Sequence, residues 1–234
     1  MTTQDSRVTL SKRFFSGNAR SYDRVVRLAT LGLDVVWKRR LLANVPPSEA
    51  ILDLACGTGI VTFALAQRFP GARIVGLDIT EDYLKVARRK AADLGLEVPF
   101  IHGNAETAVF EETFDCITSS YLPKYVDPDT LLENLAPALR PGGVVVFHDF
   151  TCPTDPVACK IWLGYNRILN AVGRRLWPEW HDVFDNNLTE LIVRTDWLRT
   201  YPPAFREHGY TDIRIERVTL DTGGVLFARK AASH

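Results

Sequence analysis

The chain has few cysteines, and none of them stands in a pattern that binds a metal or builds a disulfide framework. The four cysteines are Cys56, Cys116, Cys152 and Cys159, each among apolar neighbours. No C-x-x-C pair occurs, and no cysteine and histidine cluster has the spacing of a zinc site. We therefore expect free thiols in a reducing cytoplasm and no bound metal.

The chain also lacks an excess of charge of either sign and any long hydrophobic run. Its 28 Lys and Arg residues balance its 28 Asp and Glu residues, so no overall field attracts nucleic acid. The N-terminus is polar, without the apolar stretch of a secretion signal, and no apolar run reaches membrane-spanning length. These absences predict a cytoplasmic protein with a small-molecule partner and no nucleic acid. The oligomeric state stays open.

What the sequence does contain is a regular alternation of strand-like and helix-like segments in 234 residues, enough for one good core. The expected strands are a buried run from Ile51 into a glycine turn, Arg73–Asp78, Val98–His102, Phe114–Ser120, Val144–Phe150, Ile213–Leu220 and Val225–Arg229. The expected helices are Ile60–Phe69, Glu81–Leu94 and Leu131–Leu139, the last closed by the Pro-Gly stop at Arg140–Gly143. This order predicts a parallel α/β sheet that binds its ligand at the carboxyl ends of the strands.

The first of these strands ends in a short motif that predicts a nucleoside site. The motif reads Asp53-Leu54-Ala55-Cys56-Gly57-Thr58-Gly59, and the acid Asp78 ends the second strand about twenty residues later, where nucleotide-binding sheets place a ribose acceptor. A dinucleotide fingerprint needs a third glycine, where this chain has Thr62. Asp53 would repel a pyrophosphate and suits a cationic ligand. The alternative is a tight packing turn with no ligand.

The motif D-x-A-C-G-T-G resembles motif I of the class I S-adenosylmethionine-dependent methyltransferases. The resemblance implies one Rossmann-like domain, with a mainly parallel seven-stranded sheet, helices on both faces and a C-terminal antiparallel hairpin. We divide this domain into a helical flap at 1–45, a cofactor-binding core at 46–153, an insertion at 154–205 and the hairpin at 206–234. The cofactor would be S-adenosyl-L-methionine, and its product S-adenosyl-L-homocysteine.

Further segments are similar to the ubiquinone/menaquinone-biosynthesis C-methyltransferase family. They are Ser21-Tyr22-Asp23, Leu31–Arg40, Asn104-Ala105, Phe114–Thr118 with Ser120, Leu139–Gly143 and Thr222–Val225. The resemblance puts Asp78 on the ribose hydroxyls, Asn104 on the adenine, and Tyr22 on a flap that closes over the cofactor. The full set of expected cofactor-binding residues is Tyr22, Asp53, Ala55, Gly57, Thr58, Gly59, Asp78, Ile79, Asn104, Ala105 and Ser120. An ordinary aromatic at a helix start is the alternative for Tyr22.

One segment departs from this family. After the fourth strand the quinone enzymes carry Leu-Arg-Asn-Val, whereas this chain reads Tyr121-Leu122-Pro123-Lys124-Tyr125-Val126. Lys124 keeps a charge without the planar fork of arginine. The change weakens the expectation of a polyprenyl quinol acceptor more than it affects the fold or the methyl donor.

C-methylation of a quinol ring would need a base for the phenolic proton. The candidates are His148, Tyr121 and Asp149, with His148 favoured because histidine titrates near neutrality. For His148 and Asp149 the alternative is a structural role at the end of the fifth strand. The expected substrate-side residues are Lys124, Trp162, Tyr165, Trp180 and His181.

The insertion at 154–205 contains an apolar stripe at helical spacing between Pro156 and Leu176, with basic residues on the opposite face. It could cover the sheet, close as a lid over an apolar substrate, or lie in a membrane interface as a peripheral contact.

We therefore expect a methyltransferase for a small or lipophilic acceptor, most plausibly a quinol-like aromatic carbon. A hydroxyl or amine of another small molecule or lipid headgroup is the alternative acceptor. A sensor that binds the cofactor without turnover is the alternative of a different class.

Overall fold

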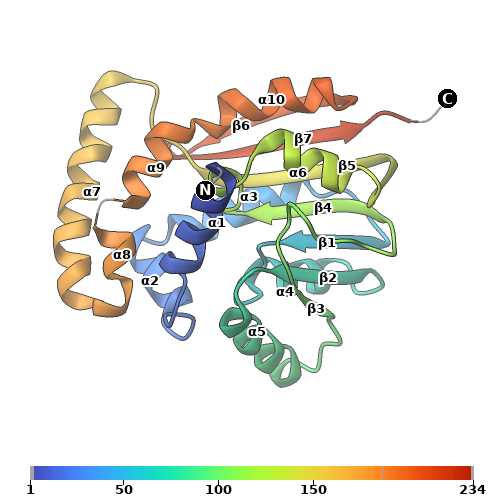
Figure 1. Ribbon diagram of the computed structural model, residues 1–234, viewed down its shortest axis with the longest axis horizontal. Helices are drawn as coiled ribbons and strands as arrows, with labels where there is room; N and C mark the ends of the chain where they lie inside the picture. The colour runs from blue at the N-terminus through green and yellow to red at the C-terminus, as the bar shows by residue number, and fades with distance from the viewer. Residues whose placement is uncertain (1–2, 186, 233–234) are drawn as a thin grey trace.

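A seven-stranded sheet in the order β3-β2-β1-β4-β5-β7-β6 forms the centre of the computed structural model (Figure 1), which describes residues 3–185 and 187–232. Its strands are β1 Ala50–Leu54, β2 Arg73–Asp78, β3 Phe100–His102, β4 Phe114–Ser120, β5 Leu139–Phe150, β6 Tyr210–Val218 and β7 Gly223–Lys230. Strands β1 to β5 pair in parallel, whereas β7 runs antiparallel to both β5 and β6. The predicted fold class, including its C-terminal antiparallel hairpin, is confirmed.

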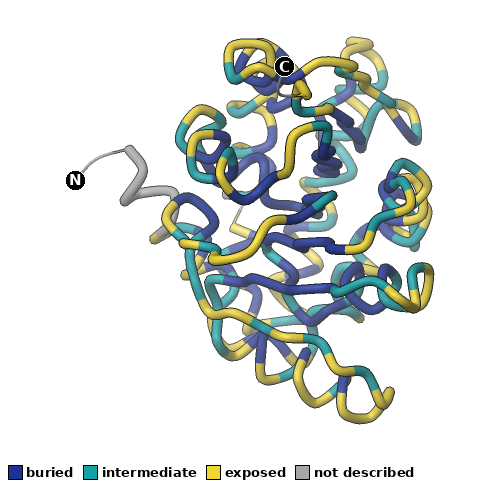
Figure 2. Tube along the Cα trace, turned by 90° about the vertical axis from the view of Figure 1, so that its right-hand side faces the viewer, coloured by how far each residue is buried: buried dark blue, intermediate teal, exposed yellow. Residues whose placement is uncertain are grey.

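Helices cover both faces of this sheet. They are α1 Thr3–Phe14, α2 Tyr22–Ala29, α3 Leu33–Asn44, α4 Ile60–Arg68, α5 Glu81–Asp93, α6 Pro128–Leu135, α7 Pro156–Leu176, α8 His181–Phe184, α9 Asn187–Thr195 and α10 Trp197–Glu207, with short 3-10 turns at Pro123–Tyr125 and Pro178–Trp180. Leu41 of α3 and Leu65 of α4 pack on one face, and Leu132 of α6 and Phe205 of α10 belong to the cluster on the other. All five residues of β1 are buried, because a parallel strand has helices on both sides (Figure 2).

The carboxyl ends of the parallel strands face a third group of helices. Figure 1 shows α7, α8 and α9 gathered beyond this edge of the sheet, with α1 and α2 between them and the strands. Within the predicted insertion, α10 contacts α6, β6 and β7 and so covers the sheet, whereas α7 contacts α8. None of the described helices is long and apolar enough to cross a membrane.

The region between α6 and β5 differs from the prediction. The helix ends at Leu135, and the Pro-Gly stop lies inside β5, which begins at Leu139 and pairs there with Phe114. The register shifts between Phe114 and Cys116, so this end of the strand carries a bulge. The left-handed backbone of Gly142, at φ 75°, accommodates the bend without ending the strand. Residues 1–2 of the predicted flap, 186 of the insertion and 233–234 of the hairpin lie outside the described residues.

Candidate active site

The turn between β1 and α4 is built from left-handed backbone. Ala55, Gly57 and Gly59 have φ values of 51°, 56° and 86°. A Cβ on Gly59 would collide with the ring of Phe63, so only glycine fits this position. The turn therefore brings bare backbone and the start of α4 to the carboxyl end of β1.

Asp78 fixes this turn from the end of the neighbouring strand β2. Its carboxylate accepts the backbone N–H of Gly57 at 2.8 Å and that of Thr80 at 2.8 Å. Burial raises the pKa of Asp78 to about 6, and these two hydrogen bonds oppose the rise. Each carboxylate oxygen has a second lone pair, so the group can still accept hydroxyls of a ligand.

A cavity at the carboxyl ends of the strands contains many of the expected cofactor-binding residues. We call it the strand-end cavity. Its lining includes Tyr22, Ala55, Gly57, Asp78, Ile79, Asn104, Ala105 and Ser120. Asn104 orders its own loop, because its side-chain oxygen accepts the N–H of Glu106 at 3.1 Å. The strand-end cavity therefore has the carboxylate of Asp78 at the end of β2, which can accept hydroxyls, and the amide of Asn104 after β3.

A smaller space, the turn pocket, continues from this cavity on the other side of Gly57. Its lining includes Lys38, Asp53, Thr58, Ser120 and Tyr121. The carboxylate of Asp53 accepts the hydroxyls of Thr62 at 2.6 Å and Thr118 at 2.9 Å, and burial raises its pKa to about 6. The turn pocket thus contains one buried cation and one buried acid. Gly59 is not among the residues lining either space and acts as the cap of α4.

The N-terminal helices are bonded to the glycine turn. Thr58 donates its hydroxyl to Asp23 of α2 at 2.5 Å, and Asp23 also forms an ion pair with Lys90 of α5. Tyr83 of α5 donates to Asn18, which precedes α2, at 2.7 Å. These contacts connect α2 and the loop before it to the glycine turn and to α5.

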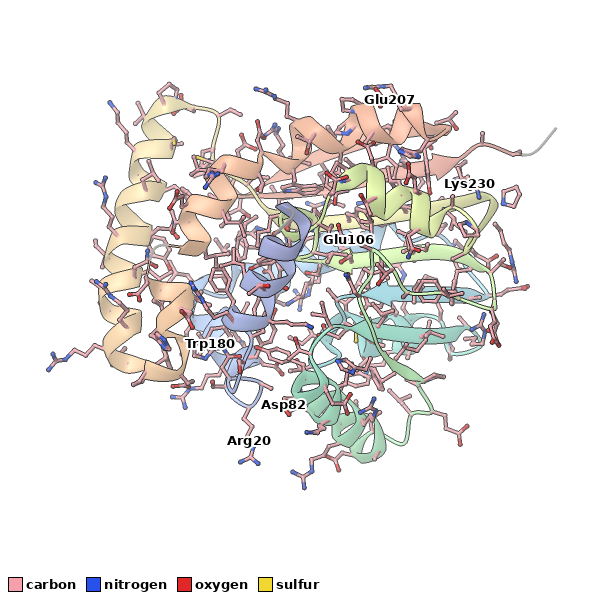
Figure 3. All side chains as sticks on the ribbon, in the orientation of Figure 1. Arg20, Asp82, Glu106, Trp180, Glu207 and Lys230 are labelled. Carbon is pink, nitrogen blue, oxygen red and sulfur yellow. The ribbon has the colours of Figure 1, made fainter. Side chains whose placement is uncertain are left out.

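A second and larger cavity lies among α2, α3, α7, α8 and α9, and we call it the helical cavity. It has a volume of about 480 Å³. Its lining includes the expected substrate-side residues Lys124, Trp162, Tyr165 and Trp180, together with Val25, Leu33, Leu169, Val183 and Ile192. Trp180, which is labelled in Figure 3, stacks against Tyr22 with ring centroids 5.9 Å apart. The cavity is therefore almost entirely apolar and aromatic.

Four aromatic residues separate the two cavities and line both of them. They are Phe15, Tyr22, Tyr121 and Tyr125. Tyr121 also lines the turn pocket, so its side chain lies where the three spaces meet. Its backbone is left-handed, at φ 75°, which is uncommon for a residue with a side chain. We call these four residues the aromatic wall, because a group passed from one cavity to the other must cross them.

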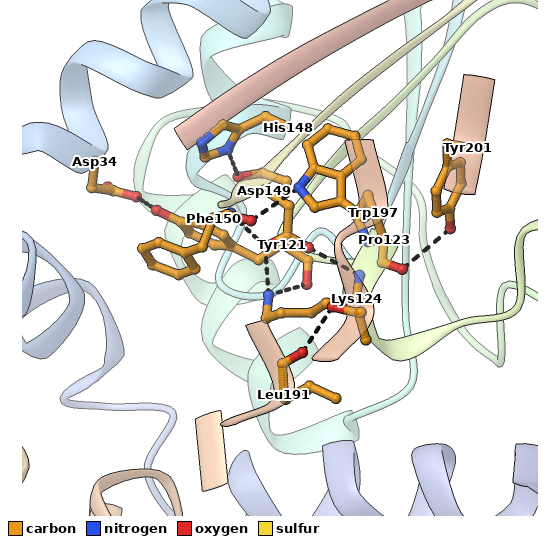
Figure 4. Close-up of polar contacts among 12 residues, drawn as sticks. Asp34, Tyr121, Pro123, Lys124, His148, Asp149, Phe150, Leu191, Trp197 and Tyr201 are labelled. Carbon is orange, nitrogen blue, oxygen red and sulfur yellow. Dashed lines mark hydrogen bonds and ion pairs between the residues drawn. The ribbon is translucent and has the colours of Figure 1, made fainter. Parts of the chain in front are cut away.

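Beneath the wall, Tyr121 belongs to a buried polar network (Figure 4). Its hydroxyl donates to Asp34 of α3 at 2.5 Å, and Lys38 donates to the same carboxylate oxygen at 2.6 Å. Lys124 donates to Asp149 at 2.7 Å and to the Tyr121 carbonyl at 2.8 Å. Burial raises the pKa of Asp149 and lowers that of Lys124, and their mutual attraction opposes both shifts.

The two histidines expected near the acceptor lie elsewhere. His148 is fully buried, is not among the residues that line the three spaces, and has its Nδ1 atom 3.0 Å from the Ser120 hydroxyl. Burial lowers its pKa well below the usual value, so the ring is neutral. His181 has a largely exposed side chain and also lies outside the cavity linings. Asp149 is held in the ion pair with Lys124. Of the three predicted catalytic side chains, the structure puts Tyr121 alone in the cavity wall.

The sequence interpretation missed Phe15, Asp34, Lys38, Tyr83 and Tyr125 among the residues that surround this junction. Asp34 and Lys38 have the four-residue spacing of a helical ion pair, which was a usable signal. The aromatic residues carry no such local signal, because each belongs to a different element. Among the described residues, no cluster of three His, Cys, Asp or Glu side chains could hold a metal ion.

Comparisons with known proteins agree with this geometry. Residues 51–143 match the family model described as a methyltransferase domain. The demethylmenaquinone methyltransferase of Thermus thermophilus is 39% identical over 68% of this chain and 74% of its own length. The ubiquinone/menaquinone biosynthesis C-methyltransferase of Legionella pneumophila is 32% identical over 68% of this chain and 67% of its own length.

A solved structure supports the fold alone. The plantazolicin methyltransferase BpumL, in complex with SAH, is 14% identical to this chain and superimposes with a TM-score of 0.64, over 97% of this chain and 96% of its own. Taken with the two relatives, these findings show that the chain belongs to the class I S-adenosylmethionine-dependent methyltransferases, within the family of demethylmenaquinone and ubiquinone/menaquinone biosynthesis C-methyltransferases.

Proposed function

We propose that this enzyme transfers the methyl group of S-adenosylmethionine to a ring carbon of a quinol-like aromatic that carries an apolar tail. The helical cavity is the observation that carries the proposal. Its volume of about 480 Å³ lies in the range of pockets that enclose a small ligand, and its lining is apolar and aromatic. The relatives are named demethylmenaquinone methyltransferase and ubiquinone/menaquinone biosynthesis C-methyltransferase, and these names support the same class of acceptor.

The donor would occupy the strand-end cavity and the turn pocket. In this arrangement Asp78 accepts the ribose hydroxyls, Asn104 and Ala105 border the adenine, and the methionine part passes Gly57 into the turn pocket. The sulfonium then faces the aromatic wall, with the acceptor ring on the other side. The enzyme's main contribution is to hold methyl and carbon in line at near-attack distance.

The wall also supplies a proton acceptor. As the ring carbon attacks, the methyl–sulfur bond breaks, its electron pair stays on sulfur, and the product is S-adenosylhomocysteine. A phenolic hydroxyl of the acceptor would donate to the Tyr121 oxygen, while the Tyr121 hydroxyl passes its proton to Asp34 across their 2.5 Å hydrogen bond. The methylated ring carbon then loses its own proton to water, and the ring is a phenolate again. This phenolate takes back, through Tyr121, the proton held by Asp34. We assign the proton-transfer role to Tyr121 with Asp34, because His148 and Asp149 have no access to the cavities.

Product analysis tests the acceptor. The enzyme is incubated with S-adenosylmethionine carrying a ¹³C-methyl group and with reduced demethylmenaquinone of short side chain, and the label is located by NMR. Label on a ring carbon supports the proposal. Label on oxygen would replace it with O-methylation, and labelling of an added amine in preference to the quinol would replace it with N-methylation.

We further propose that the enzyme takes its acceptor from an anionic lipid surface through α7. This helix has four basic residues and no acidic one, and its apolar residues Val157, Ile161, Ile168 and Leu176 are 60–68% exposed. Two more exposed leucines, Leu31 and Leu220, line the helical cavity. An exposed apolar stripe flanked by cations is the pattern of a helix that lies in a membrane interface.

Vesicle binding tests this surface. Wild-type protein should sediment with phosphatidylglycerol vesicles, and the variant Ile168→Asp/Leu176→Asp should not, because it puts charge into the stripe. Val109→Asp is the matched control, since Val109 is 90% exposed and lies outside α7. Equal sedimentation of all three proteins would refute the α7 assignment.

A further inference from the structure

Lys38 is a buried cation that the proposed reaction does not use. Lys38 lines the turn pocket, and the residue is only 6% exposed. It donates one hydrogen bond, to Asp34, among the described residues. An ammonium group has three N–H donors, so two of them remain for a ligand.

Lys124, the second buried lysine near Tyr121, has more partners than Lys38. It is even more deeply buried than Lys38, and it donates to both Asp149 and the Tyr121 carbonyl. Its ammonium also lies within 5.4 Å of three ring centroids, those of Tyr121, Tyr125 and Phe150. Lys124 therefore has two hydrogen-bond partners and three rings around it, whereas the Lys38 ammonium lies near one ring, that of Tyr121 at 5.1 Å, and donates to one oxygen among the described residues.

The other charge in the turn pocket is of opposite sign. Asp53 is also buried there, and its carboxylate already accepts two threonine hydroxyls. A pocket with one cation and one carboxylate is complementary to a zwitterion, which presents both charges a few ångströms apart. The amino-acid end of S-adenosylmethionine is such a zwitterion, with an α-carboxylate and an ammonium group.

We propose that Lys38 binds the α-carboxylate of the donor's methionine moiety, while Asp53 is the acid nearest to its ammonium group. The proposal rests on the donor placement given above, in which the methionine part enters the turn pocket. It would make α3 part of the donor site, so that the N-terminal helices bind the donor directly as well as cover it. Lys38 also donates to Asp34, which accepts the Tyr121 hydroxyl. The donor's carboxylate would therefore be connected to Tyr121 through Lys38 and Asp34.

A decarboxylated donor isolates this contact. Decarboxylated S-adenosylmethionine lacks the carboxylate and keeps the ammonium, the ribose and the adenine. Calorimetry on the full-length wild-type protein should show that the intact donor binds about 10- to 100-fold more tightly, the range expected for hydrogen bonds to a charged partner. Equal affinity for the two donors would overturn the proposal without any variant.

Variants then identify the partner of the carboxylate. Lys38→Met should lower the affinity for S-adenosylmethionine to about that for the decarboxylated donor, and should leave the affinity for the decarboxylated donor unchanged. Lys38→Arg keeps the charge and should retain part of the preference. Arg39→Met removes a cation from the next position of α3, where the side chain is exposed, and should change neither affinity.

The cycle of two proteins and two ligands gives the coupling between Lys38 and the carboxylate, because losses common to both ligands cancel. If Lys38→Met weakens both donors equally, the side chain supports the fold of the pocket and the proposal fails. Such a result leaves the acceptor proposal intact, since product labelling tests that separately. Conversely, label on oxygen would change the acceptor and leave the donor contact unaffected.

Discussion

Replacing Asp78 with asparagine removes the charge at the end of β2 while keeping the size of the side chain. The carboxylate accepts the N–H groups of Gly57 and Thr80, each at 2.8 Å. An asparagine has one acceptor oxygen, so one of these N–H groups loses its partner. A bound donor would then meet a neutral amide where a carboxylate accepted its ribose hydroxyls.

Two opposing effects determine the stability of the variant without ligand. Burial raises the pKa of Asp78 from 3.8 to about 6, and at about 1.4 kcal/mol per pKa unit the buried charge costs on the order of 3 kcal/mol at pH 7. The variant avoids this cost and loses a hydrogen bond to a charged acceptor, worth about 1.5–3 kcal/mol. We therefore expect the free energy of unfolding to stay the same or rise by up to about 1.5 kcal/mol.

The affinity for the donor should fall, although the stability does not. Hydrogen bonds to a charged acceptor contribute about 1.5–3 kcal/mol, so the dissociation constant for S-adenosylhomocysteine should rise about 10- to 150-fold. Calorimetry at pH 7.5 gives the affinity, and urea unfolding without ligand gives the stability. Asp82→Asn is the matched control, because Asp82 is a neighbouring exposed acid on α5 (Figure 3). Unchanged affinity, or a loss of stability as large as the loss of binding, would refute this role of Asp78.

Four further predictions concern the buried groups. Donor affinity should fall below pH 6 by up to about tenfold per pH unit for each of Asp78 and Asp53, because burial raises both pKa values to about 6 and we expect each carboxylate to bind the donor only when ionised; a flat profile of dissociation constants between pH 5 and 8 would contradict this. The same raised pKa values have the opposite effect on the ligand-free protein, whose free energy of unfolding should fall as the pH rises through about 6. Tyr121→Phe should lower kcat about 100-fold with unchanged donor affinity, and equal turnover would exclude Tyr121 from proton transfer. Lys124→Met should lower the free energy of unfolding by about 3–5 kcal/mol by leaving Asp149 unpaired, and the added change Asp149→Asn should restore part of it in urea unfolding.

The strands and the glycine turn could be predicted from the sequence because their signals are local. Val144–Phe147 is a continuous apolar run because β5 has neighbours on both sides and helices on both faces. The C-terminal end of α6, the helix before β5, could not be predicted. The Pro-Gly segment at Arg140–Gly143 looked like a stop, but pairing of Leu139 with Phe114 extends the strand through it. A partner strand that is distant in sequence overrode the local preference.

Among the residues that we propose to bind the cofactor, those at strand ends were predictable. Asp78 and Asn104 follow parallel strands, whose carboxyl ends meet at one edge of the sheet, so their positions along the chain fixed their neighbourhood. His148 follows the same rule but faces the interior. Its neighbours are Ser120, Trp37 and Tyr121 rather than a cavity. Strand position indicates the edge of the sheet and does not determine what the surrounding helices cover.

By itself, the sequence determined the donor side of this enzyme: a glycine turn after β1, an acid after β2 and the order of the parallel sheet. Each depends on residues that are neighbours in the chain or on the rule that parallel strands end at one edge. Only the tertiary structure decided the proposed acceptor side. The helical cavity, the Tyr121–Asp34–Lys38 network and the wall of Phe15, Tyr22 and Tyr125 join distant residues, as far apart in the chain as Phe15 and Thr222 in the cavity lining. Those contacts exist because α1–α3 and α7–α9 pack together beyond the sheet, and such packing leaves no periodic signal in the chain.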